Sequence, residues 1–537
     1  MTARWDVGAG LAALAVMLSS CLGGRAAPAA EEAGVLPQAQ LVASAASGLR
    51  TSTPRSAAPA LAPPTTIPTS STPTPHGGGA ITRQVQLSSS RPWLLLPSAD
   101  GLWAAYEDGS GLTQLLKTSE AQYAPPPFAI SPDAKALAFA LIPDFGLDSE
   151  NSNDYSLGLL SLPGLEETHL STLFAQAQIS AVATEFPQWD LGTFEGTSLY
   201  QRLQIGAAMF QPHSIAWSPS GAEIAFVAAL DGVSTDVYTY DTATGAIVRL
   251  TSGLTQATDL HWSPNGRFVI HKAVADINIG RNGMDLVDGL WIAAADGSGN
   301  RLAMQGPAEF LRWLGPDSFL AYFDEMGCGY YDLSLIRLPS GERQRLWEGQ
   351  FDDADADPKT GSILVALTNL DERGAFDECS LPKEEGLFMI RPPSFARHRI
   401  GSVAGDGWVR QIDWQEASSL FIVQTESPVM EVSTTGAISE ISKDGLSSHP
   451  SPSGRWSWAY SHGLGVLGSQ GQTARVFDGR ICATFWHGEA DMLYFLSDEE
   501  SPILYAASPP SFTPVEVIRG LALSCLDPPQ WLEVASD

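Results

Sequence analysis

The stretch IAWSPSGAEIAFVA, Ile215 to Ala228, decides the fold. An apolar run ends in a Ser-Pro-Ser-Gly turn, and a second apolar run begins at once. Proline fixes and glycine permits the backbone angles of a tight turn, so the stretch predicts a β-hairpin. Strong copies of the pattern are FAISPDAKALAFAL from Phe128, LHWSPNGRFVIHKA from Leu260 and SHPSPSGRWSWAYS from Ser448. The hairpin is therefore part of a repeating unit.

A second strand-turn-strand module follows each hairpin, as in DVYTYDTATGAIVRLT from Asp236 and GLWIAAADGSGNRLA from Gly289. Weaker hairpin copies begin at Leu311, Ala354, Ile412 and Ala483. Almost no segment has the periodicity of a long amphipathic helix. Four strands recurring every 35 to 55 residues or so are typical of an all-β protein with the β-propeller fold.

WSPSGAEIAF from Trp217 and WSPNGRFVI from Trp262 resemble the WD-like repeats of TolB-type propellers, and DGSG at Asp108 and Asp296 matches a later turn of those repeats. The resemblance covers most of residues 90–520 and implies a propeller. TolB carries an α/β domain before its propeller, whereas this chain has a low-complexity segment there. The partners of TolB are therefore not carried over.

Both ends of the repeat region are incomplete units. The segment from Trp93 supplies three strands without a first one, and the segment from Leu521 supplies one strand. We expect them to form one composite blade that closes a propeller over residues 83–537. Counting that blade gives about nine candidate units, but propellers usually have four to eight blades, so we favour eight, with seven to nine as the range.

The N-terminus predicts export. Arg4, an apolar run and LSSC ending at Cys21 resemble a bacterial lipoprotein signal over residues 1–21, in which Cys21 becomes lipidated. An ordinary secretory signal is the alternative. Residues 22–82 are rich in Ala, Pro, Ser and Thr, which predicts a disordered tether. We expect an exported propeller anchored by lipid to the cell membrane or envelope, periplasmic or at the cell surface.

Composition limits the partners. Hydrophobic residues make up 44% of the chain, enough for a large core, while charged residues make up 17% with a net charge of −30. This acidic balance argues against nucleic acid, whose phosphates require clustered Lys and Arg.

Four cysteines remain besides Cys21. Cys328 and Cys379 fall between the second and third strands of consecutive units, and Cys482 and Cys525 fall on first strands of consecutive units. Equivalent positions of adjacent blades lie close together, so we expect disulfides Cys328–Cys379 and Cys482–Cys525. Four free thiols are the alternative.

Catalytic motifs are missing from the sequence. It contains no G-x-S-x-G elbow and no H-E-x-x-H. His261 and His271 lie on two strands of one unit and could approach each other, but ordinary sheet positions explain them. Asp353, Asp355 and Asp357 alternate as at the start of a calcium loop, but the later Gly and Glu of that loop are missing. We expect no catalytic residues, no cofactor and no metal.

The long links gather on one face of the expected propeller. They connect the second strand of a blade to the third, or one blade to the next. The long links that begin at Pro143, Asp276, Asp324 and Asp371 are acid-rich. The longest is an insertion at about 174–213, which carries Phe186, Trp189, Phe194 and Tyr200. Long loops on a rigid scaffold often bind partners, so these four residues are candidates for partner binding. A packing flap is the alternative.

These observations favour a non-catalytic, monomeric envelope lipoprotein whose propeller is a platform for binding an envelope protein or a glycan. Fold does not dictate function, and two alternatives remain. One is a glycosidase-like envelope enzyme with two carboxylates at the channel mouth. The other is a purely structural spacer.

Overall fold

The computed structural model describes Leu87 and residues 91–532, apart from residues 99, 118–126, 143–154, 163, 186–197, 279–284, 326–328, 368–384, 403–408, 417, 426–428, 443–448, 452, 454, 461–462, 469–471, 488–489, 500, 524 and 526–528. All of the described residues belong to one compact unit. The predicted signal segment, its Cys21 and the predicted tether lie outside them.

The described strands form nine antiparallel sheets with four main strands each, in chain order in eight of them, and one sheet has a short fifth strand. After the N-terminal strands, the first sheet contains β4 (Phe128–Ile130), β5 (Ala136–Leu141), β6 (Ser156–Ser161) and β7 (Glu167–Thr172), and the second contains β8 (Ile215–Trp217), β9 (Glu223–Ala228), β10 (Asp236–Asp241) and β11 (Ile247–Arg249). The third sheet contains β12 (Gln256–Trp262), β13 (Phe268–Asp276), β14 (Leu286–Ala294) and β15 (Asn300–Gln305), and the fourth contains β16 (Ala308–Trp313), β17 (Ser318–Glu325), β18 (Gly329–Arg337) and β19 (Glu342–Arg345), with β20 (Gln350–Phe351) paired to β18. The fifth sheet contains β21 (Asp353–Ala356), β22 (Ile363–Leu367), β23 (Gly386–Arg391) and β24 (Ala396–Gly401).

Three further sheets complete the series along the chain. They contain β25 (Val409–Gln415), β26 (Leu420–Thr425), β27 (Val429–Ser433) and β28 (Ile438–Ser442); β29 (His449–Pro450), β30 (Trp456–Tyr460), β31 (Leu464–Gly468) and β32 (Thr473–Phe477); and β33 (Ile481–His487), β34 (Met492–Ser497), β35 (Leu504–Ala507) and β36 (Val515–Ile518).

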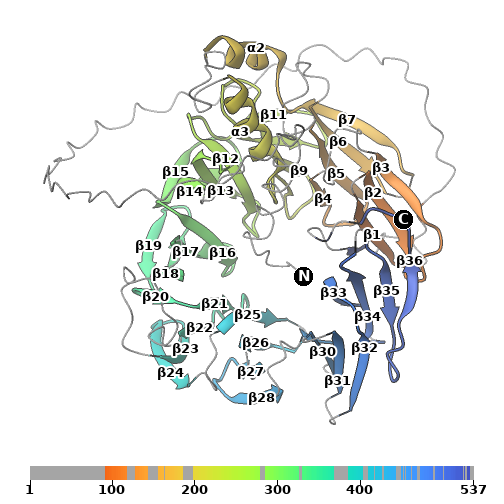
Figure 1. The fold of residues 1–537 in the computed structure, drawn as a ribbon. Helices are drawn as coiled ribbons and strands as arrows, with labels where there is room; N and C mark the ends of the chain where they lie inside the picture. Colours follow the sequence, from red (N-terminus) through yellow and green to blue (C-terminus); the bar gives the residue numbers. More distant parts are fainter. Residues whose placement is uncertain are drawn as a thin grey trace, which may run out of the picture. The chain divides into compact units, whose positions relative to one another are not determined.

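The sheets follow one another around a ring, with first strands such as β16 and β21 toward its centre and fourth strands such as β19 and β24 at its periphery (Figure 1). The chain is therefore a β-propeller with nine four-stranded blades. Nine lies within the expected range and is one more than the favoured number. The usual upper limit of eight misled that choice, because each of the candidate units is a real sheet.

The Ser-Pro motif builds the turn between the first two strands of a blade. Ser218 Oγ accepts a hydrogen bond from the Glu223 backbone N–H at 3.0 Å, and Ser263 Oγ accepts one from Phe268 N–H at 3.0 Å. Gly221 and Gly266 take positive φ angles of 72° and 68° in these turns, a conformation that favours glycine. The serine thus satisfies the backbone N–H that starts the second strand.

The repeated tryptophan connects neighbouring blades. The indole N–H of Trp262 on β12 donates to the carbonyl of Ala216 on β8, and that of Trp217 on β8 donates to Ala129 on β4, both at 3.0 Å. These two side chains therefore contribute to the packing between blades.

The ring closes through both ends of the chain. The ninth blade consists of β37 (Gln530–Leu532), β1 (Trp93–Ser98), β2 (Gly101–Tyr106) and β3 (Thr113–Lys117), with β37 paired antiparallel to β1. The expected disulfide between Cys482 on β33 and Cys525 is confirmed and ties the closing segment to the preceding blade. Cys328 and Cys379 lie outside the described residues, so the other expected disulfide stays a prediction.

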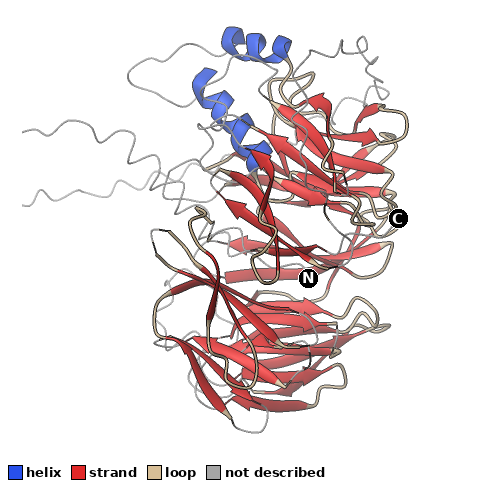
Figure 2. Ribbon diagram, turned by 90° about the vertical axis from the view of Figure 1, so that its right-hand side faces the viewer, coloured by secondary structure: helices blue, strands red, loops and turns tan. Residues whose placement is uncertain are grey.

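Two helices occupy the insertion between β7 and β8, α2 (Gln176–Glu185) and α3 (Ser198–Phe210). They lie together beside the strands, as the blue ribbons of Figure 2 show. The sequence analysis did not anticipate them, although the α3 sequence SLYQRLQIGAAMF is rich in residues that favour helix. Among the described residues, neither these nor any other helix has the length and apolarity to cross a membrane.

Candidate functional site

Both ends of the insertion are fixed to the propeller. At its start, the Ala175 N–H donates to Ala229 O at 3.0 Å, and Ala229 N–H donates back to Leu173 O at 2.7 Å. At its end, Leu260 N–H on β12 donates to His213 O at 3.0 Å. The insertion therefore begins against the second strand of one blade and ends against the first strand of the next one.

Helix α3 is held by the link between β13 and β14. Gln204 makes reciprocal hydrogen bonds with Ile277, accepting from its N–H at 2.6 Å and donating to its carbonyl at 2.8 Å, and it also donates to Asp276 at 3.0 Å. The Tyr200 hydroxyl donates to the same Asp276 carboxylate. The insertion and this second-to-third link thus share one face, as the strand order predicted. We call it the long-link face.

Tyr200 therefore anchors α3, with a side chain that is only 8% exposed. Among the four residues expected to contact a partner, it is the one that the structure describes. Phe186, Trp189 and Phe194 lie outside the described residues, so their role stays a prediction.

Two exposed leucines lie next to segments that are linked to α3. Leu286, 64% exposed, pairs in register with Asp276, the residue that holds Tyr200 and Gln204. Leu254, 87% exposed, follows Gly253, whose carbonyl accepts a hydrogen bond from Ser234 at 2.8 Å, and the neighbouring Val233 accepts one from α3. Large apolar side chains this exposed are a candidate contact for another protein.

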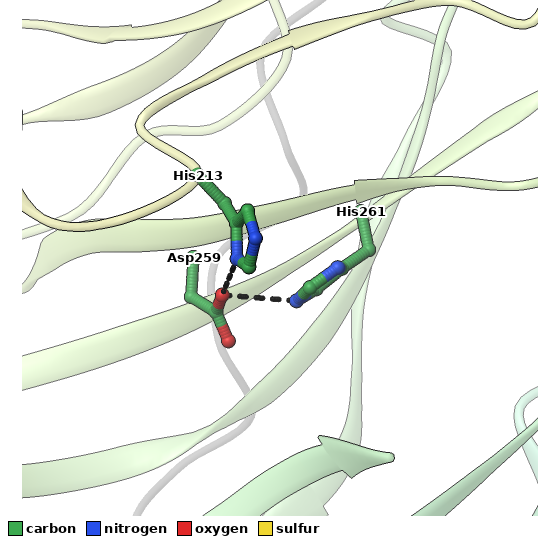
Figure 3. Close-up of side chains that lie close together, drawn as sticks. All are labelled: His213, Asp259 and His261. Atoms are coloured by element: carbon green, nitrogen blue, oxygen red, sulfur yellow. Dashed lines mark hydrogen bonds and ion pairs between the residues drawn. The ribbon is translucent and has the colours of Figure 1, made fainter. Parts of the chain in front are cut away.

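A second candidate site lies on the first strand of the blade that holds α3. His213, which ends the insertion, and His261 on β12 both direct a ring nitrogen at Asp259, between them in space (Figure 3). His213 Nδ1 lies 3.0 Å and His261 Nε2 lies 2.9 Å from the same Asp259 Oδ1. We call these three residues the His–Asp–His cluster.

Charge pairing shapes the electrostatics of the cluster. Burial opposes ionisation of Asp259, but the charge of His261 and hydrogen bonds from both imidazoles outweigh it and hold the pKa of Asp259 well below its ordinary value. Nearby, Lys272 Nζ lies 2.5 Å from Glu309 Oε2. Burial raises the pKa of Glu309 to about 7 although Lys272 opposes that shift. The cluster thus holds an ionised carboxylate next to a lysine that is already paired.

The sequence allowed an approach of His261 to His271 but favoured ordinary sheet positions for both, and it did not indicate the histidine that lies beside His261. His271 on β13 is buried, its Nε2 lies 3.4 Å from Asn300 Oδ1, and His261 pairs in register with Ile270 instead. The true neighbour, His213, comes from a different blade connection. No local spacing could have indicated it, because only the folded insertion brings it to β12.

The alternating aspartates of the calcium-like stretch serve the backbone instead. Asp353 Oδ2 accepts the Ile412 N–H at 2.6 Å, and Asp355 Oδ2 accepts the Trp414 N–H at 2.7 Å, both across to β25 of the next blade. Asp357 accepts the Lys359 N–H at 2.9 Å within its own turn. All three side chains are buried and belong to blade packing.

Comparisons with known proteins add similarity of architecture alone. No family model and no curated protein sequence matches the chain. A solved eukaryotic initiation factor is 9% identical, covers 83% of this chain and 99% of its own, and has a TM-score of 0.47. A putative TolB from Agrobacterium tumefaciens is 17% identical, covers 49% of this chain and 80% of its own, and has a TM-score of 0.27.

TolB from Acinetobacter baumannii is 12% identical, covers 82% of this chain and 81% of its own, and has a TM-score of 0.28. Propellers of the TolB type are thus among the structures similar to this chain, as the repeat motif indicated. The sheets themselves establish the propeller, and the similarities carry no statement about activity.

Proposed function

We propose that this protein is a non-catalytic propeller, held at a membrane of the cell envelope by a lipid on Cys21, that binds another envelope protein through its long-link face. The observation that carries the proposal is the pair of exposed leucines, Leu254 and Leu286, each next to a segment that is linked to the anchored helix α3. A rigidly held helix beside exposed apolar side chains costs little ordering entropy when a partner docks.

The charge of this face indicates the chemistry of the partner. Asp285 and Asp288 lie beside Leu286, and the whole chain has a net charge of −30. A complementary surface would combine apolar contacts with Lys or Arg at its rim, because complementary charge favours encounter with the right partner. Phe186, Trp189 and Phe194 belong to the same insertion and are part of the proposal as further contacts.

Glycoside hydrolysis is the less favoured function. It needs two carboxyl groups free to face one sugar from opposite sides. In the described part of the innermost blade strands, Asp259 is bonded to two imidazoles and Glu309 to Lys272. These pairings favour binding over acid–base catalysis.

Crosslinking on intact cell envelopes, followed by purification of the full-length protein and mass spectrometry, tests the proposal. Leu286→Asp combined with Leu254→Asp should abolish recovery of a stoichiometric partner. Val515→Asp on β36 is the matched control, because Val515 has the same 64% exposure as Leu286 but lies on an outer strand. A partner that survives the double substitution, or that the control also loses, would refute this binding face.

A further inference from the structure

We propose that His213, Asp259 and His261 form a binding site for one divalent transition-metal ion of the zinc class, with one nitrogen from each histidine and a carboxylate oxygen as ligands. This inference is independent of the proposed partner binding. It rests on the convergence of three ligand-type side chains, two from strand β12 and one from the end of the insertion before β8, onto one point (Figure 3).

The spacing of the ligand atoms suits such an ion. Zn²⁺ binds imidazole nitrogen and carboxylate oxygen at about 2.0–2.2 Å, so ligand atoms around it lie about 3 Å apart. The two nitrogen-to-Oδ1 distances are 3.0 and 2.9 Å, and the three candidate atoms all lie within 4.8 Å of one another. Small side-chain rotations would bring these three atoms to ligand distance from one ion.

The identity of the ligands selects the class of ion. Two imidazoles favour zinc and its transition-metal neighbours, whereas Ca²⁺ and Mg²⁺ prefer sites made of oxygen atoms. Three protein ligands with an open fourth position are also the pattern of zinc sites that exchange a ligand. Mg²⁺ is therefore a suitable negative probe.

The backbone holds two of the ligands in unusual conformations. His213 and Asp259 have positive φ angles of 58° and 55°, which residues other than glycine adopt at a cost. Asp259 also sits in the register shift between Thr258 and His261 on β12. Bulges of this kind redirect side chains and recur next to functional sites. The Leu260 N–H to His213 O hydrogen bond of 3.0 Å then fixes the two segments to each other.

Packing also orients the third ligand. The His261 ring stacks on Phe310 of the next blade, with centroids 4.1 Å apart and planes at 20°, and its centroid lies 5.0 Å from that of His213. A ring held on its face can turn little about its bonds, so Nε2 stays directed at Asp259. Ligands that are oriented before the ion arrives bind it more tightly.

An ion can reach this site from solvent. The side chain of His213 is 49% exposed, while Asp259 and His261 are 23% and 18% exposed. The groups around the cluster are Lys272, which lies 2.5 Å from Glu309, together with Asp285 and Asp324. Lys272 is thus offset by carboxylates, and the surroundings do not repel a cation.

Isothermal titration of the purified, chelator-treated full-length protein with Zn²⁺ tests the proposal, with Mg²⁺ as the comparison ion. We expect one Zn²⁺ per chain at micromolar affinity or tighter, no saturable Mg²⁺ binding, and at least about 100-fold weaker Zn²⁺ binding in Asp259→Asn and His261→Gln. His169→Gln on β7, whose side chain is exposed, should bind like the unsubstituted protein.

The wild-type protein keeps the test decisive if a variant folds poorly. Saturating Zn²⁺ should raise its thermal unfolding midpoint, because an ion that binds only the folded chain stabilises it. Absence of saturable Zn²⁺ binding and of that rise would overturn the proposal. Undiminished binding in folded Asp259→Asn and His261→Gln would also overturn it, since the ion would then lie elsewhere.

Discussion

Aspartates on innermost strands serve opposite purposes in two blades. On β21, Asp353 and Asp355 accept backbone N–H groups of β25, so their partners are fixed by the fold. On β12, Asp259 accepts two imidazoles, one of them half-exposed. A carboxylate bonded to buried backbone groups cannot change partners without opening the blades, whereas one bonded to side chains can exchange them for an ion. The partner of an aspartate, rather than its position on the strand, separates structure from function here.

Loss of the disulfide that closes the ring should have the largest effect on the free energy of unfolding, and the effects of changes at the two aspartate sites can be compared with it. Cys482→Ser should lower the free energy of unfolding by about 4 kcal/mol, because the bond closes a loop with a sequence separation of 43 residues. Urea unfolding with and without reductant checks this. Reductant should cancel the difference in stability between the wild type and the variant, since both share any contribution of the predicted Cys328–Cys379 bond. A wild type indifferent to reductant would mean that the covalent link does not stabilise closure.

Removing an aspartate of β21 should lower the free energy of unfolding strongly. Asp355→Ala should cost about 3 kcal/mol, since it leaves the buried Trp414 N–H without its acceptor and Arg312, 2.8 Å from Asp355 Oδ1, without its counter-charge. Chemical unfolding measures the loss. Asp355→Asn keeps an acceptor oxygen and should lose less. Equal losses in the two variants would show that the N–H contact contributes nothing.

His271 on β13, the strand paired with β12, is a buried imidazole that can be compared with the more exposed imidazoles of the His–Asp–His cluster. Burial lowers the pKa of His271 from 6.5 to about 4. Between pH 6.5 and about pH 4, His271 is protonated in the unfolded chain but neutral in the folded chain. Stability is therefore complete above pH 6.5 and falls as the pH drops toward 4, by about 3 kcal/mol.

His271→Gln removes the titrating imidazole and with it this contribution to the pH dependence of stability. The difference in unfolding free energy between wild type and variant, followed from pH 7 to pH 4, should shrink by this amount. Parallel pH profiles would contradict the assignment of a neutral, buried imidazole to this position.

The sequence predicted most of the fold. Of the two aspartate sites, it drew attention to the β21 aspartates but not to the His–Asp–His cluster. The strong and weak hairpin copies together placed the first strand of most blades within a few residues, because turn chemistry is local, and the incomplete units at the two ends predicted the closing blade. The alternating acids at Asp353–Asp357 suggested a calcium loop, which the missing Gly and Glu argued against. The structure bonds them to backbone N–H groups, and Asp355 also pairs with Arg312. The His–Asp–His cluster left no motif, since His213 reaches Asp259 only through the insertion and a β-bulge.

Helices α2 and α3 were missed for a related reason. The repeat pattern indicates strands, and in the described parts of the other links no helix corresponds to α2 or α3. Its attachment through Gln204 and Asp276 depends on tertiary contacts that residue spacing does not show.

The smallest stability effect is expected on the β12 side. Asp259→Asn should cost only about 1 kcal/mol without metal, because the asparagine keeps an acceptor oxygen for the imidazoles and the half-exposed His213 can also bond to water. Unfolding in the presence of a chelator measures this. A loss as large as that of Asp355→Ala would place Asp259 among the structural aspartates and remove the contrast between the two sites.

Anomalous diffraction from crystals grown with Zn²⁺ tests this contrast most directly. The account predicts one zinc peak about 2.0–2.2 Å from His213 Nδ1, His261 Nε2 and an Asp259 oxygen, with Asp353 and Asp355 still bonded to the β25 backbone. A zinc ion at the β21 aspartates, or an empty His–Asp–His cluster in the same crystals, would contradict it.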